Sequence, residues 1–126
     1  MLSREIEEFA RALVRNVRDA SIRNCDALSK GSDGSPIAKR WKDANPSLGS
    51  ELPSVMIPDS IDEAVFQLLH AIDEGLLRLK YVSDSGREVD LRIEGGGELA
   101  GWYMMSGGWR AMFSNERFVD DFSDLT

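Results

Sequence analysis

The sequence has almost no cysteine or histidine, the side chains that form disulfides and hold structural zinc. It contains one cysteine, Cys25, and one histidine, His70, so it cannot form an intramolecular disulfide and lacks the ligands of a structural zinc site. No apolar run approaches the roughly 18 residues of a membrane-spanning helix. Charged residues follow Met1 almost at once, so we do not expect a signal peptide. These absences lead us to expect a cytoplasmic protein that holds no metal and no cofactor.

The chain also has no basic excess. Its formal net charge is −7, from 15 Lys and Arg against 22 Asp and Glu. The signs are unevenly placed: residues 1–42 hold nine basic and six acidic side chains (+3), and residues 43–126 hold six and sixteen (−10). An acidic protein has no general affinity for phosphate backbones, so we do not expect nucleic acid as a partner. The polarity favours head-to-tail or two-fold self-association or an encounter with a basic partner, and an ordinary solvated surface explains it as well.

The length of 126 residues, of which 42% are apolar, indicates a single domain over 1–126. Its strongest element is a central helix over 61–74, which has the apolar periodicity of a one-faced helix. Ser60 and Glu63 have the spacing of a capping box at its start, and Gly75 stands where a left-handed cap would lie.

Two further helices are predicted before the central one. A long helix over 4–29 should bury one apolar stripe. A short helix should begin at Ser35-Pro36 and end before Pro46. The segment 46–58 fits either a loop or an early part of the central helix. The buried stripe of the long helix consists of Ile6, Phe9, Ala10, Leu13, Val17 and Ala20, and a solvated face consists of Arg11, Arg15 and Arg18.

After Gly75 the period of the apolar residues changes from 3.6 to 2. This alternation predicts a β-hairpin of Leu77–Tyr81 and Glu88–Ile93, joined by a turn over 83–86. On its exposed face Arg78 or Lys80 should pair with Glu88 or Asp90. Leu99–Met105 and Trp109–Phe113 are the third and fourth strand candidates, and the glycines at 95–97 fit a bend between strands better than a phosphate loop.

The fold class that follows is α+β. A long N-terminal helix, a short second helix and the central helix should pack on a C-terminal antiparallel meander of three to four strands.

Several short motifs resemble those of a family of small bacterial proteins that have no assigned function. They are Ser35-Pro36-Ile37-Ala38-Lys39, Gly97-Glu98-Leu99-Ala100-Gly101, Gly108-Trp109 and Phe113-Ser114. The similarity covers about two-thirds of the chain, and the family has a more acidic stretch where this chain has residues 103–107. The resemblance implies no activity, ligand or functional residue.

The search for chemistry leaves two sets of candidate residues. Glu94 and Glu98 flank the glycine bend and, with His70, are the candidate ligand-binding residues; His70 fits a structural residue equally well. The last third of the chain is rich in large apolar residues that one sheet face cannot bury, so either a helix and the tail cover the second face or it is an interface. The candidate homodimer interface is Trp102, Tyr103, Met105, Trp109 and Phe113.

The sequence therefore favours a non-enzymatic, cytosolic protein-interaction module that self-associates through its C-terminal sheet. An immunity-like role fits by analogy with other small acidic bacterial proteins. The alternative is a small-molecule-binding or hydrolytic protein with a pocket between the central helix and the sheet. A third hypothesis is nucleic-acid binding through Arg11, Arg15, Arg18 and residues 39–42.

Overall fold

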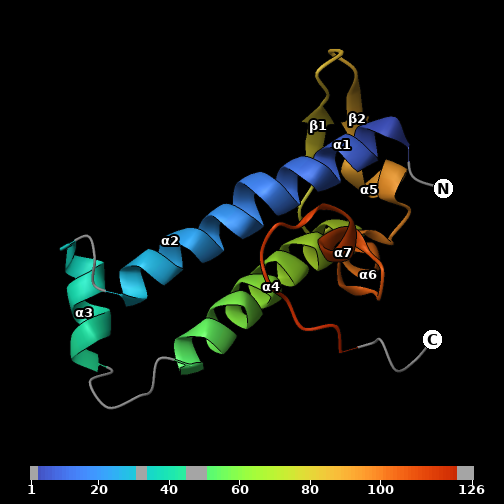
Figure 1. The fold of residues 1–126 in the computed structure, drawn as a ribbon. Helices are drawn as coiled ribbons and strands as arrows, with labels where there is room; N and C mark the ends of the chain where they lie inside the picture. The colour runs from blue at the N-terminus through green and yellow to red at the C-terminus, as the bar shows by residue number, and fades with distance from the viewer. Residues whose placement is uncertain (1–2, 31–33, 45–50, 122–126) are drawn as a thin grey trace.

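The computed structural model describes residues 3–30, 34–44 and 51–121. Figure 1 shows two long helical rods that lie side by side, with a hairpin and the three short C-terminal helices gathered around one end of them. The first and last thirds of the chain meet at this end, because α1 packs against α7. No helix in the described ranges is both long and apolar enough to cross a membrane.

The first rod confirms the predicted helix over residues 4–29. It runs without a break through α1 (Arg4–Ala12), η1 (Leu13–Asp19) and α2 (Ala20–Ser29), of which η1 is π-helical. Ser3 caps it, because its Oγ accepts a hydrogen bond from the backbone N–H of Ile6 at 3.1 Å.

The short second helix is also confirmed, as α3 (Pro36–Ala44), which packs on α2 at the far end of the rods. The Oγ of Ser35 accepts from the backbone N–H of Ala38 at 3.1 Å and caps this helix. The predicted loops at 31–33 and 46–50 lie outside the described residues.

The second rod is α4 (Glu51–Asp73), which begins ten residues before the predicted start of the central helix. The capping box at Ser60 is therefore wrong, since Ser60 lies inside the helix, as does Pro58. The end of the helix is as predicted: Gly75 has a φ of 76°, and Leu76 N–H donates to Ala71 O at 2.9 Å.

The first hairpin is confirmed, in a shorter form than predicted. Strands β1 (Lys80–Val82) and β2 (Glu88–Asp90) are antiparallel, with Tyr81 opposite Val89. The predicted ion pairs across its exposed face are present: Arg78 with Asp90 at 2.7 Å, and Lys80 with Glu88 at 3.0 Å.

The prediction of a three- to four-stranded meander, and with it the α+β class, is wrong. The described chain is mostly helical, and its sheet has two strands. After β2 come three short helices, α5 (Leu91–Gly95), α6 (Leu99–Met104) and α7 (Trp109–Phe113). The glycine run is not a bend between strands, because it ends α5 with Gly96 at a φ of 58°.

Acidic side chains cap the first two of these helices, α5 and α6. Asp90 Oδ1 accepts from the backbone N–H of Arg92 at 3.0 Å and starts α5 directly after β2. The carboxylate of Asp73, at the end of α4, accepts from the N–H groups of Leu99 and Ala100 at 3.0 and 2.9 Å. A residue distant in sequence therefore satisfies the first amides of α6, which the local pattern alone does not reveal.

The core lies where α1, η1 and α4 meet α5, α6 and α7. In α6 the buried side chains are Leu99, Ala100 and Tyr103, which is helical spacing, and α7 repeats it with Trp109, Arg110 and Phe113. The central members of this core are Ile6, Val14, Leu69, Ile72, Leu91, Leu99 and Trp109.

Candidate functional site

The π-helical segment η1 decides which side chains of the first rod point inward. A π turn holds more residues than an α turn, so the buried stripe moves on by one residue beyond Leu13. Arg18 is 0% exposed and takes the inward place that we predicted for Val17, which is 48% exposed. The prediction that Arg18 shares a solvated face with Arg11 and Arg15 is therefore wrong, although those two side chains are exposed.

Asp62 on α4 is the acceptor at the centre of a buried cluster. Its carboxylate accepts from Arg18 Nε at 2.7 Å, from Arg110 Nη1 at 2.9 Å and from the Tyr103 hydroxyl at 2.5 Å. None of these four residues is more than 4% exposed. Donors from η1, α6 and α7 thus converge on one carboxylate and tie these elements to α4.

A second buried carboxylate, that of Asp19, balances the charge. It accepts from Arg18 Nη1 at 2.9 Å, from the Ser114 hydroxyl at 2.9 Å and from the Asn115 backbone N–H at 2.7 Å. Two arginines and two aspartates make the group electrically neutral, which lowers the cost of burying it. We call the following residues the buried charge cluster: Arg18, Asp19, Asp62, Tyr103 and Arg110.

Tyr103 and Arg18 of the cluster stay protonated near neutral pH. Burial, and then the hydrogen bond and negative charge of Asp62, raise the pKa of Tyr103 far above its ordinary value. Burial lowers the pKa of Arg18, but the hydrogen bond and charge of Asp62 outweigh this effect and leave that pKa raised. Neither group exchanges a proton near neutral pH, so the arrangement suits the fixing of structure better than acid–base chemistry.

Neither tyrosine of the chain should ionise near pH 10 in the folded protein. Burial and the hydrogen bond from its hydroxyl to Glu8 raise the pKa of Tyr81 to about 12, and the pKa of Tyr103 is raised further. Ultraviolet titration of tyrosinate should show both groups at about pH 10 in denaturant and neither there in buffer. Because folding raises the pKa values of the tyrosines, their contribution to the free energy of unfolding is present below about pH 10. It is lost as the pH rises towards 12. Tyr81→Phe should remove the earlier of the two folded-state titrations, and a titration near pH 10 in buffer would contradict the structure.

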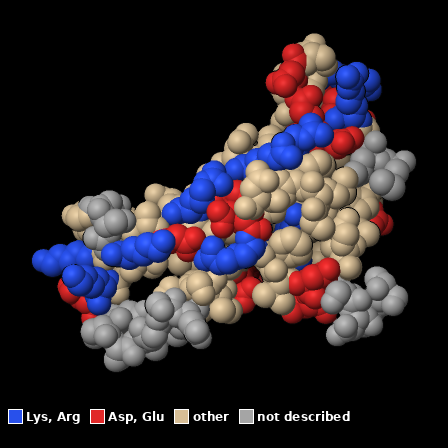
Figure 2. All heavy atoms as spheres, in the orientation of Figure 1, with Lys and Arg blue, Asp and Glu red and all other residues tan. Residues whose placement is uncertain are grey.

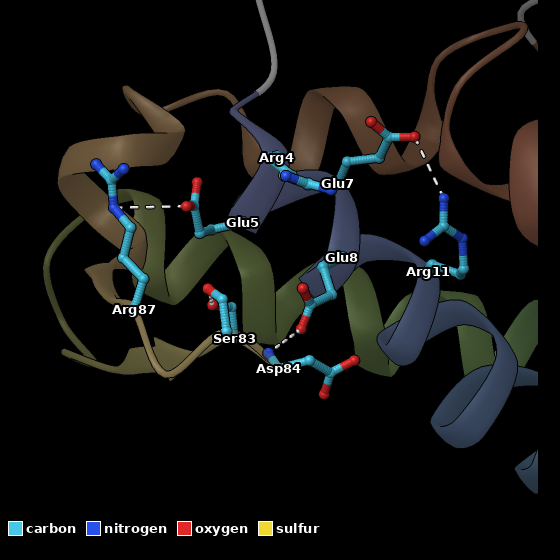
Figure 3. A pocket seen from close by; sticks show the side chains of 9 residues that line it. Arg4, Glu5, Glu7, Glu8, Arg11, Ser83, Asp84 and Arg87 are labelled. Carbon is cyan, nitrogen blue, oxygen red and sulfur yellow. Dashed lines mark hydrogen bonds and ion pairs between the residues drawn. The ribbon is translucent and has the colours of Figure 1, made fainter.

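Figure 3 shows an open groove between the first turns of α1 and the tip of the β1–β2 hairpin. Its volume is about 840 Å³. On one wall Arg87 Nε pairs with Glu5 at 3.4 Å, and the Glu8 carboxylate accepts from the Asp84 backbone N–H at 2.7 Å (Figure 3). Acidic and basic side chains are mixed around the opening, so no single sign of charge selects a ligand there.

The structure does not gather the predicted ligand-binding residues around this groove. Glu94 on α5 and Glu98 before α6 are exposed, and neither lines it. His70 is exposed on α4, where its ring stacks on Phe66 with the centroids 6.0 Å apart. Within the described ranges, no three His, Cys, Asp or Glu side chains are placed to hold a metal ion.

Most of the predicted interface residues lie inside the chain. Tyr103, Trp109 and Phe113 are 0%, 1% and 5% exposed, and Trp102 is half-buried with its ring 6.2 Å from that of Trp109. Met105 is 52% exposed. Because α6 and α7 replace the predicted strands, these aromatic side chains pack on the rods.

The sequence does contain one signal for the buried charge cluster. Asp62 precedes Val65, Leu69 and Ile72 by three, seven and ten residues, so a carboxylate shares the apolar face of its helix. For a helix that starts at residue 61, Asp62 lies in the first turn, where a carboxylate favours the helix dipole, and this explanation fails because α4 begins at Glu51. Nothing in the local pattern marks Arg110 or Arg18.

Exposed cations gather on the outer side of the first rod and of α3. Figure 2 shows a band of Lys and Arg that follows α1, η1 and α2 and continues at α3. We call the following exposed side chains of η1, α2 and α3 the basic face: Arg15, Arg23, Lys30, Lys39, Arg40 and Lys42.

The chain was also compared with known proteins. The resemblance to small bacterial proteins stays a prediction, and function is inferred from the surface and the buried groups described above. Comparison with protein-family models, with curated proteins and with solved structures found no match to this chain.

Proposed function

We propose that this protein is a cytosolic, non-enzymatic interaction module that binds an acidic partner protein through its basic face. The observation that carries the proposal is the segregation of charge, because these six cations lie together on a chain of net charge −7. None of the six forms an ion pair with another residue of the described ranges. Arg117 lowers the pKa of Asp26, and of the six cations Lys30 adds a smaller effect. Exposed cations that form no ion pair within the described ranges can meet carboxylates of a partner.

The state of the buried charge cluster supports a non-enzymatic role. Its hydrogen bonds are made within the chain, and its members do not line the groove of Figure 3. The alternative of a hydrolytic or small-molecule pocket receives no such support, because Glu94, Glu98 and His70 are exposed away from that groove. Self-association through a C-terminal sheet has no such support, because the described residues after β2 form the helices α5, α6 and α7.

A protein fits the basic face better than a nucleic acid. A phosphate backbone presents uniform negative charge and favours a surface of one sign. Here the cations of the rod are interrupted by carboxylates, with Glu7 beside Arg11 at 3.3 Å, and exposed Asp43 follows Lys42 on α3. Discrete carboxylates on a protein surface can match such a pattern one by one.

The proposal predicts that reversing charge on α3 abolishes capture of the partner. Immobilised wild-type chain should retain specific acidic proteins from a host extract, and Lys39→Glu/Arg40→Glu should lose them. The matched control is Lys80→Glu/Arg92→Glu, which changes the net charge equally on exposed residues away from this face. Mass spectrometry of the eluates at low and high salt measures the effect, which should weaken with ionic strength.

Two results would contradict the proposal. One is equal retention by the two charge-reversed variants, which would separate binding from the basic face. The other is binding of duplex DNA at low salt with a steep salt dependence, which would assign the face to nucleic acid.

A further inference from the structure

After α7 the chain continues as an irregular segment that contacts both rods. We call residues 114–121 the strap. It leaves α7 in an extended conformation at Ser114 (φ −74°, ψ 142°) and contains no helix or strand. In Figure 1 it passes across α4 between the two rods.

The buried charge cluster holds the main chain of the strap. Arg18 Nη2 donates to the Arg117 carbonyl at 2.7 Å, and Arg110 Nη1 lies 3.4 Å from the Val119 carbonyl. Asp19 accepts from the Asn115 backbone N–H at 2.7 Å. These contacts involve groups that every peptide has, so they do not depend on the side chains of the strap.

Two side chains of the strap supply specificity. The Arg117 guanidinium pairs with Asp26 of α2 at 2.8 and 3.0 Å, and Nε donates to the Ser54 carbonyl of α4 at 2.8 Å. Ser54 stands four residues before Pro58, which has no N–H to offer that carbonyl, so Arg117 takes the place of a helical hydrogen bond. The ring of Phe118 lies between two guanidinium groups, 4.8 Å from Arg110 and 5.9 Å from Arg18.

These contacts are those by which a protein binds an extended peptide. Buried side chains bind the main chain, an acidic residue pairs with a cation, and two guanidinium groups contact an aromatic ring. In addition, Arg110 is 3% exposed, and its Nε has no hydrogen-bond partner in the described chain. One buried donor of the site is therefore left for an acceptor that the strap does not supply.

We propose that the surface beneath the strap, which we call the strap groove, is a binding site for an extended segment of a partner protein. In that segment a basic residue is followed by an aromatic one. In the free protein the strap occupies this groove as an internal competitor. The site is separate from the basic face, so neither proposal depends on the other.

A partner's segment fits this site better than the strap of a second copy. The Ser114 hydroxyl is held by Arg18 and Asp19 at 2.9 Å, so the hinge of the strap is itself part of the site. A second copy would have to bring its own α7 to the groove, and Trp109 and Phe113 of α7 are buried in the core of their own chain. A free peptide carries no such constraint.

A labelled peptide of the strap sequence, residues 115–121, tests the proposal on the full chain. A tethered segment competes at an effective concentration of about a millimolar, so the wild-type chain should bind the peptide weakly. Arg117→Ala/Phe118→Ala in the chain weakens the competitor without changing the groove. It should bind the peptide at least about tenfold more tightly, as measured by fluorescence anisotropy.

A charge swap controls for specificity. The peptide carrying Arg117→Glu should not bind the double variant, and adding Asp26→Arg to the chain should restore its binding. Lys39→Glu/Arg40→Glu should leave peptide binding unchanged, which separates this site from the basic face.

Hydrogen exchange on the wild-type chain provides a second test if the double variant does not fold. Millimolar peptide should increase exchange at the amide of Asn115, which Asp19 protects in the free protein. Equal peptide affinity of wild type and double variant, equal binding of the charge-reversed peptide, or unchanged exchange would overturn the proposal. A concentration-dependent dimer with exchanged straps would assign the groove to a second copy and would also overturn it.

Discussion

Asp62→Ala should destabilise the protein by about 3–5 kcal/mol, the cost of removing one partner from a buried ion pair. The carboxylate of Asp62 is the acceptor for Arg18 Nε and Arg110 Nη1, and both arginines are almost fully buried. Without it, Arg18 retains Asp19, Arg110 loses the carboxylate with which it pairs, and the Tyr103 hydroxyl loses its acceptor. Urea denaturation followed by circular dichroism measures the change in the free energy of unfolding.

Two further variants identify the cause of this loss. Asp59→Ala removes an exposed carboxylate from the same helix and should change stability by less than about 0.5 kcal/mol. The double variant Asp62→Leu/Arg110→Met removes one buried charge of each sign, leaves the Arg18–Asp19 pair in place and should recover much of the stability. If Asp62→Ala costs less than about 1 kcal/mol, these arginines are solvated in solution and the buried cluster is not intact.

Gly108→Ala should be destabilising by about 3 kcal/mol, the upper range for overpacking. A Cβ at this position would lie 2.2 Å from the Trp102 carbonyl oxygen and 2.8 Å from that of Met105. Both are backbone atoms, so no side-chain rotation relieves the contact, and α6 and α7 must move apart. The φ of Gly108 is −81°, so the effect is steric and not a matter of left-handed backbone.

Gly101→Ala is the matched control within α6. Its added Cβ would meet no heavy atom within 4 Å, and the residue is exposed. Because alanine favours helix over glycine, this variant should gain about 0.5–1 kcal/mol. Thermal unfolding of the two variants should therefore shift in opposite directions, and a shift in the same direction would contradict the described packing of α6 on α7.

Local signals in the sequence predicted the elements that depend on local chemistry. The start of the second helix at Ser35, the left-handed end at Gly75 and the Arg78–Asp90 pair beside the hairpin involve residues that are close in sequence. For such features the residues that form the sequence pattern also make the stabilising contact.

The predictions failed where the cause is distant in the chain. The helical state of α6 depends on Asp73, which lies 26 residues before Leu99, and alternation of large residues is a poor guide in a segment of six residues. The inward position of Arg18 depends on a π-helical turn, and charged residues are so rarely buried that a solvated face was the reasonable expectation. For the same reason the burial of Arg110, and with it the buried charge cluster, was not predicted.

The hydrogen bond from Arg18 to the Arg117 carbonyl forms late during synthesis. The two residues are 99 positions apart, and at about 5–20 residues per second Arg117 is made about 5–20 seconds after Arg18. During that interval the nascent first rod carries a guanidinium group whose partners are not all made, first Asp62 and then the strap. The first rod therefore cannot reach its final packing until the strap has been made, 99 residues after Arg18.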